Sequence, residues 1–337
     1  MTTQLDAFLA AKKETTYGTY VAPTSPLAFI DESLEQKINY VDAQGLRPGR
    51  RTTLSTQRAV GSKSIVGDVT VEATAAEPGI LFEAAFGSGT NTLLGTTAYQ
   101  HLFVPAADYL PSYSIQVGIP PLGGGAVTPF SFTGMQCSAL EIDAKMGAIA
   151  SLKASWVGQD VVTSQSAITP VYPAVNELFT YVGGALVVGG TPTTPTTNTL
   201  STGGTAAATV VDANIKIDNA LDSGGFTLGG AGKRTRPAAA LLAKITGTLT
   251  AEFRDTVFWA AYTGNTQLGL VLNFTGSLIE TTYFNALQIY LPVIMLDGET
   301  PKVKAGSIIT QSVQFTALQN PTLNMAYVVL RNAQAAY

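Results

Sequence analysis

Apolar and polar residues alternate along several stretches of this chain, which is the period expected of β-strands with one buried face. The clearest example covers residues 140–146 and 152–156, where apolar positions alternate with charged or small polar ones on both sides of a turn at Gly147. This pattern predicts an antiparallel hairpin with one face on a core and the other face polar. The chain is therefore expected to be mainly β.

One alternating strand occurs twice. Gly67–Glu72 is matched by Gly247–Glu252, and each is followed by a short apolar stretch that predicts a helix, the first ending at Gly87. Upstream, residues 38–42 are echoed by residues 215–219. In both copies the order is strand, long basic loop, strand, helix and hairpins. A repeated unit of this size predicts two tandem β-sandwich or half-barrel domains, each with a flanking short α-helix.

The expected domain limits are residues 1–165 and 166–337. The first domain begins with an N-terminal arm, rich in Thr and Pro, that follows a short helix over 4–12 and lies on the surface. The second domain carries an insertion, rich in Thr, Gly and Pro, at about 182–208. We expect that insertion to be flexible.

Charged residues make up only 12% of the 337 residues, about half of what is usual for a soluble domain, and the net charge is −4. Two interpretations stay open: an uncharged polar surface, or a surface largely covered by neighbouring subunits. The acidic balance argues against a nucleic-acid-binding protein. Neither a signal peptide nor a membrane-spanning stretch is predicted, so folding in a cytoplasm is expected.

The residues that usually carry catalysis or bind metals are scarce. His101 is the single histidine and Cys137 the single cysteine, so neither a Cys/His metal cluster nor a histidine-based triad is expected. The stretch 229–234 is similar to a phosphate-binding loop, but Arg234 and Thr227 stand where that loop needs Ser or Thr and Gly. We therefore predict no enzyme activity, no catalytic residue, no cofactor and no metal.

Two basic loops fall at matching places in the two repeats. They contain Arg47, Arg50, Arg51, Arg58 and Lys63 in the first, and Lys233, Arg234, Arg236 and Lys244 in the second. They are either solvated hairpin loops or contacts between subunits or rings. In the second case they would pair with acidic residues such as Asp31, Glu32, Glu35, Asp297 and Glu299. Direct DNA binding is a third interpretation, which the overall acidity disfavours.

In its layout and in several phrases the chain resembles the major tail tube proteins of phages with long, non-contractile tails. The resemblance spans nearly the whole chain and is carried by residues 13–19, 67–72, 77–87, 215–219, 246–253 and 291–294. It implies a β-sandwich flanked by a helix, whose inward strands join those of neighbouring subunits into a continuous β-barrel around a channel. Rings would stack through long loops and termini, and DNA would pass through the channel during ejection.

Family members with two fused tube domains form trimers that mimic a hexamer, so the duplication favours a homotrimeric, pseudo-hexameric ring. The resemblance further implies a virion tail protein that is assembled in the host cytoplasm. Its partners would be other copies of itself, the tape measure protein, and the tail terminator and tip proteins. DNA would pass transiently and non-specifically, and no membrane is involved. The insertion at 182–208 would decorate the outside of the tube.

Within this framework the polar faces of the repeated strands are candidates for the channel lining. Their residues are Asp68, Thr70 and Glu72 in the first repeat and Thr248, Thr250 and Glu252 in the second. An acidic lining would repel phosphates and let DNA slide. The same faces are equally suited to a subunit contact.

Two other functions remain open. One is a different virion shell or decoration protein, although the sequence predicts no helix longer than about three turns, the globular average. The other is a β-rich carbohydrate-binding or hydrolytic module, for which clustered aromatic residues and a carboxylate pair would be expected.

Overall fold

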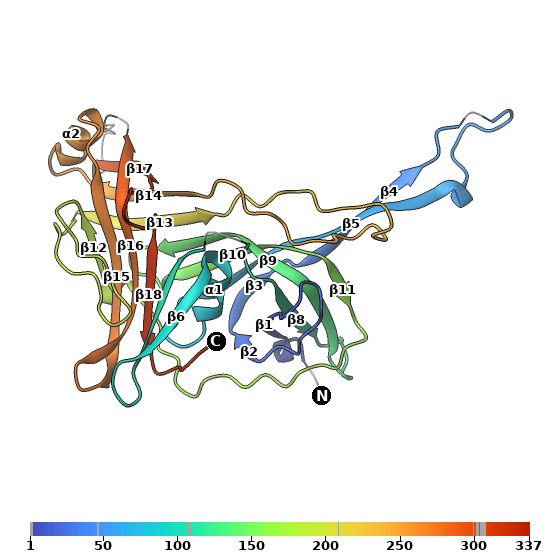
Figure 1. The fold of residues 1–337 in the computed structure, drawn as a ribbon, viewed down its shortest axis with the longest axis horizontal. Coiled ribbons are helices and arrows are strands. Elements are labelled where there is room, and N and C mark those ends of the chain that lie inside the picture. Colours follow the sequence, from blue (N-terminus) through green and yellow to red (C-terminus); the bar gives the residue numbers. More distant parts are fainter. Residues whose placement is uncertain are drawn as a thin grey trace.

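The computed structural model describes residues 3–45, 47–106, 109–207, 209–298, 300, 303 and 308–337. The described residues form eighteen strands and two α-helices, so the expectation of a mainly β protein is confirmed. All strand pairs are antiparallel, and the pairing links the whole described chain (Figure 1).

The first half of the chain contains β1 (Phe8–Lys13), β2 (Ser25–Leu27), β3 (Phe29–Glu32), β4 (Glu35–Asp42), β5 (Arg58–Glu72), α1 (Gly79–Phe86), β6 (Gly87–Leu93), β7 (Tyr99–Pro105), β8 (Tyr113–Ile119), β9 (Thr128–Ala144), β10 (Ser151–Gly158) and β11 (Asp160–Val162). The second half contains β12 (Gly184–Val188), β13 (Val210–Asp218), β14 (Lys244–Glu252), α2 (Val257–Thr263), β15 (Leu268–Glu280), β16 (Tyr283–Gly298), β17 (Thr310–Ala317) and β18 (Tyr327–Asn332).

One layer is a broad sheet to which both halves contribute. Its strand order is β4–β5–β10–β9 from the first half, followed by β13–β14–β17–β16 from the second. The two halves meet where β9 pairs with β13, with Ile142 opposite Ile215 and Leu140 opposite Ile217. The halves therefore form one continuous sheet, which we call the broad sheet.

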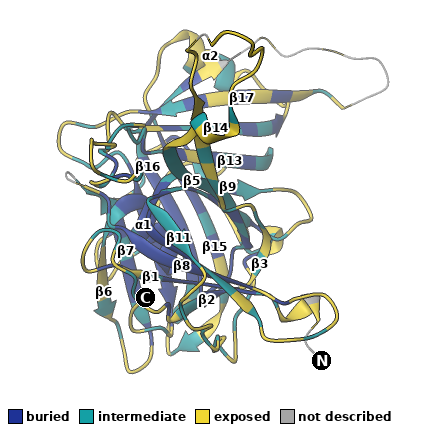
Figure 2. Ribbon diagram, turned by 90° about the vertical axis from the view of Figure 1, so that its right-hand side faces the viewer, coloured by how far each residue is buried: buried dark blue, intermediate teal, exposed yellow. Residues whose placement is uncertain are grey.

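The second layer covers the apolar face of the broad sheet. The early parts of the long strands β9 and β16 belong to it and pair with β8 and β15 respectively. Strand β18 joins β16 to β7, so the C-terminal strand of the chain pairs with a strand of the first half. Between the layers lies a single large core, which appears dark blue in Figure 2.

The two helices differ in burial. In α1 every residue except Glu83 is buried, and Gly87 ends the helix in the left-handed conformation with its N–H bonded to the Glu83 carbonyl. In α2 no residue is buried, and Val257 is 64% exposed. The helices follow β5 and β14, as the sequence predicts.

The repeated Gly–Glu strands are the centres of β5 and β14. Gly67 lies opposite Trp156 of β10, and Gly247 lies opposite Phe315 of β17. A Cβ atom at Gly247 would lie 2.3 Å from the Asn214 carbonyl oxygen and 2.3 Å from the Phe315 ring, so no larger residue fits there. At Gly67 a Cβ atom would lie 2.4 Å from the Ser33 carbonyl oxygen, so the repeated glycine is required by packing in both strands, against an aromatic ring only at Gly247.

The duplication extends to the details of strand pairing. The first half has β-bulges between Phe29 and Asp31 and between Tyr113 and Ile115. The second half has bulges at the corresponding places, between Val210 and Asp212 and between Leu268 and Leu270. Because bulges fix register, the two halves share the same register around these two bulges, whereas a further bulge between β9 and β10 at Ser155 and Trp156 has no counterpart in the described pairing of β16 with β17.

Three expectations are corrected by the pairing. Residues 8–13 form the strand β1 and not a helix, and Leu9, Ala10 and Ala11 are buried, so this part of the arm is core. Residues 38–42 do not correspond to 215–219: Glu35 opposite Val66 matches Lys216 opposite Thr246, a shift of four positions. Pairing with β8 and β15 gives β1 and β12 equivalent places, so residues 184–188 of the expected insertion belong to the repeated unit.

Candidate functional site

The exposed face of the broad sheet is polar across both halves. The opposite face carries the buried residues of β5, β9, β13 and β14, whereas the exposed face carries the six residues proposed as a channel lining. Of these, Glu252 is exposed and the other five are partly exposed: Asp68, Thr70, Glu72, Thr248 and Thr250. The strand alternation therefore brings both sets to one surface.

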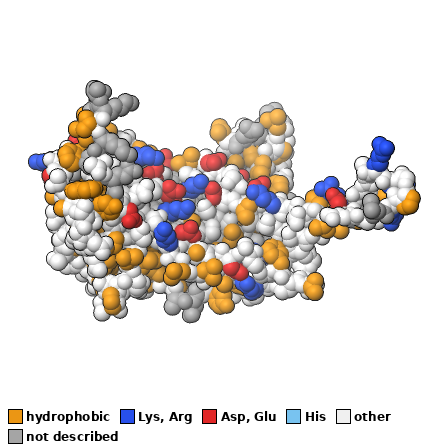
Figure 3. All heavy atoms as spheres, turned by 90° about the horizontal axis from the view of Figure 1, so that it is seen from above, with side chains coloured by type: hydrophobic (Ala, Val, Ile, Leu, Met, Phe, Trp, Pro, Cys, Tyr) orange, Lys and Arg blue, Asp and Glu red, His pale blue; other side chains and the backbone are white. Residues whose placement is uncertain are grey.

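Carboxylates clearly outnumber lysines on this face. The residues that share it through cross-strand pairing are Asp31, Glu35, Asp68, Glu72, Glu141, Asp143, Asp212, Asp218, Glu252 and Asp297, against Lys37, Lys153, Lys216 and Lys244. Figure 3 shows acidic and basic side chains gathered over the middle of one side of the molecule. The face is therefore acidic but carries lysines that pair with part of its charge.

The Asp68–Lys153 pair illustrates this balance. Their charged atoms lie 2.8 Å apart across β5 and β10. Burial raises the pKa of Asp68, but hydrogen bonds from Lys153 and Ser155 outweigh it and the pKa is lowered. The pKa of Lys153 is raised by the same hydrogen bond. Both groups therefore remain charged near neutral pH.

The second basic loop, residues 219–243, folds against the first half of the same chain. Asn219 Nδ2 donates to the carbonyls of Ala85 in α1 (2.9 Å) and Cys137 in β9 (3.0 Å). The Lys63 N–H of β5 donates to the Gly232 carbonyl (2.7 Å), and Lys233 forms an ion pair with Asp160. This loop is thus fixed between β5, β9 and β11.

Asp222 holds the arginines of this loop in place. Arg236 Nη2 donates to Asp222 Oδ2 (2.7 Å), and the Ala239 N–H donates to Oδ1 (2.7 Å). These bonds, that from Arg236 first, lower the pKa of Asp222. Arg234 is only 7% exposed, donates to the Asp222 carbonyl (3.2 Å) and lies over the Phe226 ring. The arginines therefore engage their own chain.

The first basic loop, residues 43–57, projects away from the body with the outer ends of β4 and β5 (Figure 1). Its arginines Arg47, Arg50 and Arg51 are exposed, and Arg58 lies 3.7 Å from Asp42 and over the Tyr40 ring. In the described part of this loop, every hydrogen bond joins the loop to itself. The structure thus places the two sets of arginines in opposite situations.

The described acidic residues considered as partners lie on the broad sheet or on β3, which pairs with β5 beside β4. Asp31 and Glu32 belong to β3, Glu35 to β4, and Asp297 to the end of β16. Glu299 lies outside the described residues. None of these carboxylates forms an ion pair with the basic loops among the described residues.

The broad sheet ends in two free edges. Over the described residues β4 pairs on one side only, with β5. At the other end, β15 pairs with β16 as far as Ile294, and residues 295–298 pair only with β17. Unpaired strand edges bind other strands readily, so both ends can accept a further strand.

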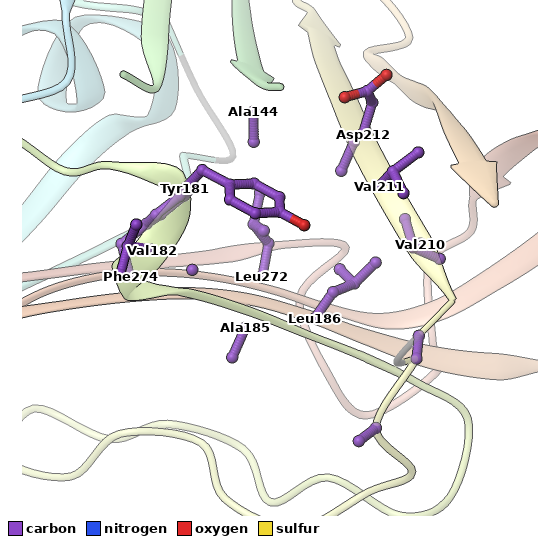
Figure 4. Close-up of a pocket in the computed structure, with 14 residues that line it drawn as sticks. Ala144, Tyr181, Val182, Ala185, Leu186, Val210, Val211, Asp212, Leu272 and Phe274 are labelled. Atoms are coloured by element: carbon purple, nitrogen blue, oxygen red, sulfur yellow. The ribbon is translucent and has the colours of Figure 1, made fainter. Parts of the chain in front are cut away.

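A cavity of about 510 Å³ adjoins the seam between the halves (Figure 4). Ala144 of β9, Leu186 of β12, Val211 and Asp212 of β13 and Phe274 of β15 help to line it. The Asp212 carboxylate in this lining accepts a hydrogen bond from the Met146 N–H, with 2.8 Å between Oδ1 and the nitrogen. The lining is mainly apolar, and its polar side chains are Tyr181 and Asp212.

The described ranges also form no metal site. No group of three or more His, Cys, Asp and Glu side chains is placed to hold a metal ion. His101 is fully buried between Asn91 and Asn332, where burial lowers its pKa. None of the described helices is long and apolar enough to cross a membrane.

The model of the phage tail tube protein family matches residues 4–317 of the chain. The chain belongs to this family. No curated protein matches it. As a phage tail tube protein it is a structural component of the virion tail, and its family is not one of enzymes.

Sequence reasoning about this tail tube protein missed the contacts that distinguish the two basic loops. Asp222, Asp160 and Asn219 hold the second loop, and each is an ordinary polar residue in a stretch without periodicity. The free edges of β4 and β16 were also missed, since pairing partners cannot be assigned from one strand's pattern. One signal in the sequence did indicate that the two basic loops differ: they follow equivalent strands but have different lengths.

Proposed function

We propose that three copies of this protein close into a ring in which six similar tube domains surround a channel. Stacked rings then form the hollow tube of a phage tail, and DNA passes through it during ejection. The two domains are residues 1–165 and 166–337. The proposal follows from family membership and from the repeated topology.

The observation that carries this proposal is the pairing of β9 with β13. It joins two equivalent four-stranded units edge to edge in one sheet, with one polar and one apolar face. A further unit can be added at either free edge by the same pairing, and a closed ring of such units leaves no edge unpaired.

The polar face of the broad sheet is the proposed channel lining. Its excess of carboxylates would repel the DNA backbone, and its lysine pairs would keep the repulsion moderate. The assembled tube would also contact the tape measure protein inside it and the tail terminator and tip proteins at its ends. Assembly would take place in the host cytoplasm.

Negative-stain electron microscopy of the purified protein at rising concentration tests the proposed assembly. Hollow tubes or stacked rings are expected. Monomers at all concentrations would contradict self-assembly and favour a decoration or carbohydrate-binding module.

The channel assignment is tested by charge reversal. The double variant Glu72→Lys and Glu252→Lys should still assemble but release DNA more slowly, because lysines attract the phosphates. The matched control is Glu72→Gln with Glu252→Gln, which removes charge without reversing it and should have a smaller effect. Normal ejection from particles with the lysine variant would contradict the channel assignment.

A further inference from the structure

We propose that β4 of one copy pairs antiparallel with the free edge of β16 of a second copy, in a register that places Lys37 opposite Asp297. The loop 43–57 of the first copy then lies along the second copy. This inference rests on the self-assembly proposed above and names the residues of its seam.

The seam inside the chain supplies the geometry. Strand β13 pairs with the part of β9 that extends beyond β8, with Asp218 opposite Ala139 and Ile217 opposite Leu140. Loop 219–243 then continues from β13 along the first half, beginning with the hydrogen bonds of Asn219. The strand β13 and the loop that follows it therefore both contact the first half of the chain.

Matching pairs identify the equivalent residue on the other strand. Lys37 lies opposite Ser64 as Asp218 lies opposite Lys244, because β5 and β14 align through Gly67 and Gly247. Lys37 therefore holds the place of Asp218.

The same procedure applies to the receiving edge. Ala139 lies opposite Ser155, which faces Asp68 on the next strand. Asp297 lies opposite Gln314, which faces Thr248. Since Asp68 and Thr248 are equivalent, Asp297 holds the place of Ala139, and a lysine meets an aspartate across the new seam.

Both edges are accessible and oppositely charged at this point. The Lys37 side chain is 61% exposed and, among the described residues, forms an ion pair with Glu35 on its own strand. Asp297 is exposed and accepts a hydrogen bond from Thr316. Opposite charges directly across an antiparallel pair stabilise it, so the register is favoured electrostatically as well as by symmetry.

The burial of the helices fits the same arrangement. Helix α1 is buried and receives Asn219 from the strand end beside it, whereas α2 exposes Val257 and 38% of Tyr262. The residue equivalent to Asn219 is Ile38, and it is followed by the exposed Tyr40 and Val41. A second copy would therefore bring apolar residues to the uncovered helix.

Disulfide cross-linking tests the register. In the double variant Lys37→Cys and Asp297→Cys, directly opposed Cα atoms would lie about 4.5–5.5 Å apart, within the range of a disulfide. Oxidised tubes should give covalent trimers as the largest species on a non-reducing gel. Native Cys137 stays unreactive, because burial raises its pKa to about 12.

Two matched pairs serve as controls. Lys37→Cys with Met295→Cys is displaced by two positions and should cross-link at least about tenfold less, because the diagonal separation is about 7–8 Å. Asp218→Cys with Ala139→Cys should close within one chain and leave the protein monomeric on the gel. Equal or preferential cross-linking of the displaced pair would overturn the register.

Charge exchange provides a second test that needs no disulfide. Lys37→Glu and Asp297→Lys should each raise the concentration needed for assembly by about two- to fivefold, and the combined variant should restore it. Failure of the combined variant to recover would overturn the pairing. Tubes that form without a 37–297 cross-link would overturn the seam and leave the tube function standing, whereas a wild-type protein that never assembles would overturn both.

Discussion

The loops 43–57 and 219–243 follow equivalent strands in the two halves, yet their surroundings differ. The second loop is held against α1, β5, β9 and β11 of its own chain, and one of its arginines is buried. The first loop projects from the body, and its described residues bond only to one another. Both are basic, so charge alone does not explain the difference.

The difference follows from the position of each loop in the repeat. A loop that leaves one domain reaches the domain beside it, and for the second loop that neighbour belongs to the same chain. For the first loop, no described part of the chain lies beside it. In the proposed assembly, covalent fusion has made one of two equivalent interfaces internal, and the other is left for a second copy.

The largest effect on stability is expected when the aspartate that binds the arginines of the second loop is replaced, and a matched aspartate beside the first loop gives the comparison. Asp222→Ala removes the acceptor of Arg236 and Ala239 beside the buried Arg234, and should lower the free energy of unfolding by about 2–3 kcal/mol. The matched variant Asp42→Ala removes the exposed partner of Arg58 and should cost less than about 0.5 kcal/mol. Urea denaturation of the dilute protein measures both, and equal losses would contradict the contrast between the loops.

A pH effect concerns the second contact between the halves, where β18 pairs with β7. Burial lowers the pKa of His101, so the folded chain keeps the ring neutral while the unfolded chain takes up a proton below pH about 6.5. Stability should be highest above that pH and fall as pH decreases toward the folded pKa, by at most about 1.4 kcal/mol per pH unit. The variant His101→Gln should flatten this slope in urea titrations between pH 7 and 5, and an unchanged slope would assign the acid sensitivity to other groups.

The smallest effect on stability is expected in the first loop. Combined replacement of Arg47, Arg50 and Arg51 by Ala should change the unfolding free energy by less than about 0.5 kcal/mol, because all three side chains are exposed. The same variant should assemble less readily, since the proposed contact of this loop lies on a second copy. Sedimentation at several concentrations distinguishes the effects, and unimpaired assembly would mean that these arginines are merely solvated.

Elements with local periodicity could be predicted from the sequence. The strands Gly67–Glu72 and Gly247–Glu252 and the hairpin after residue 140 follow from the alternation of apolar and polar residues alone. The polar face shared by these strands follows from the same alternation. Its place in a tube remains a proposal.

Features that depend on distant partners could not be predicted. Phe8, Leu9 and Ala10 form a short apolar run that fits a helix or a buried strand equally well, and β2 and β8 decide between them. The four-residue shift between the repeats could not be seen either. Residues 38–42 resemble residues 215–219 by chance, and the true register is defined only by pairing with β5 and β14. Strand β12, within the insertion expected at 182–208, could not be predicted either, because its pairing with β15 identifies it.

The central claim is that the seam within the chain is repeated between chains, and a rotationally averaged cross-section of the assembled tube tests it most directly. The account predicts three chains per ring, seen as three-fold symmetry with six similar lobes around a hollow centre. A ring of six chains with twelve lobes, or a ring whose chains meet elsewhere than at β4 and β16, would contradict it.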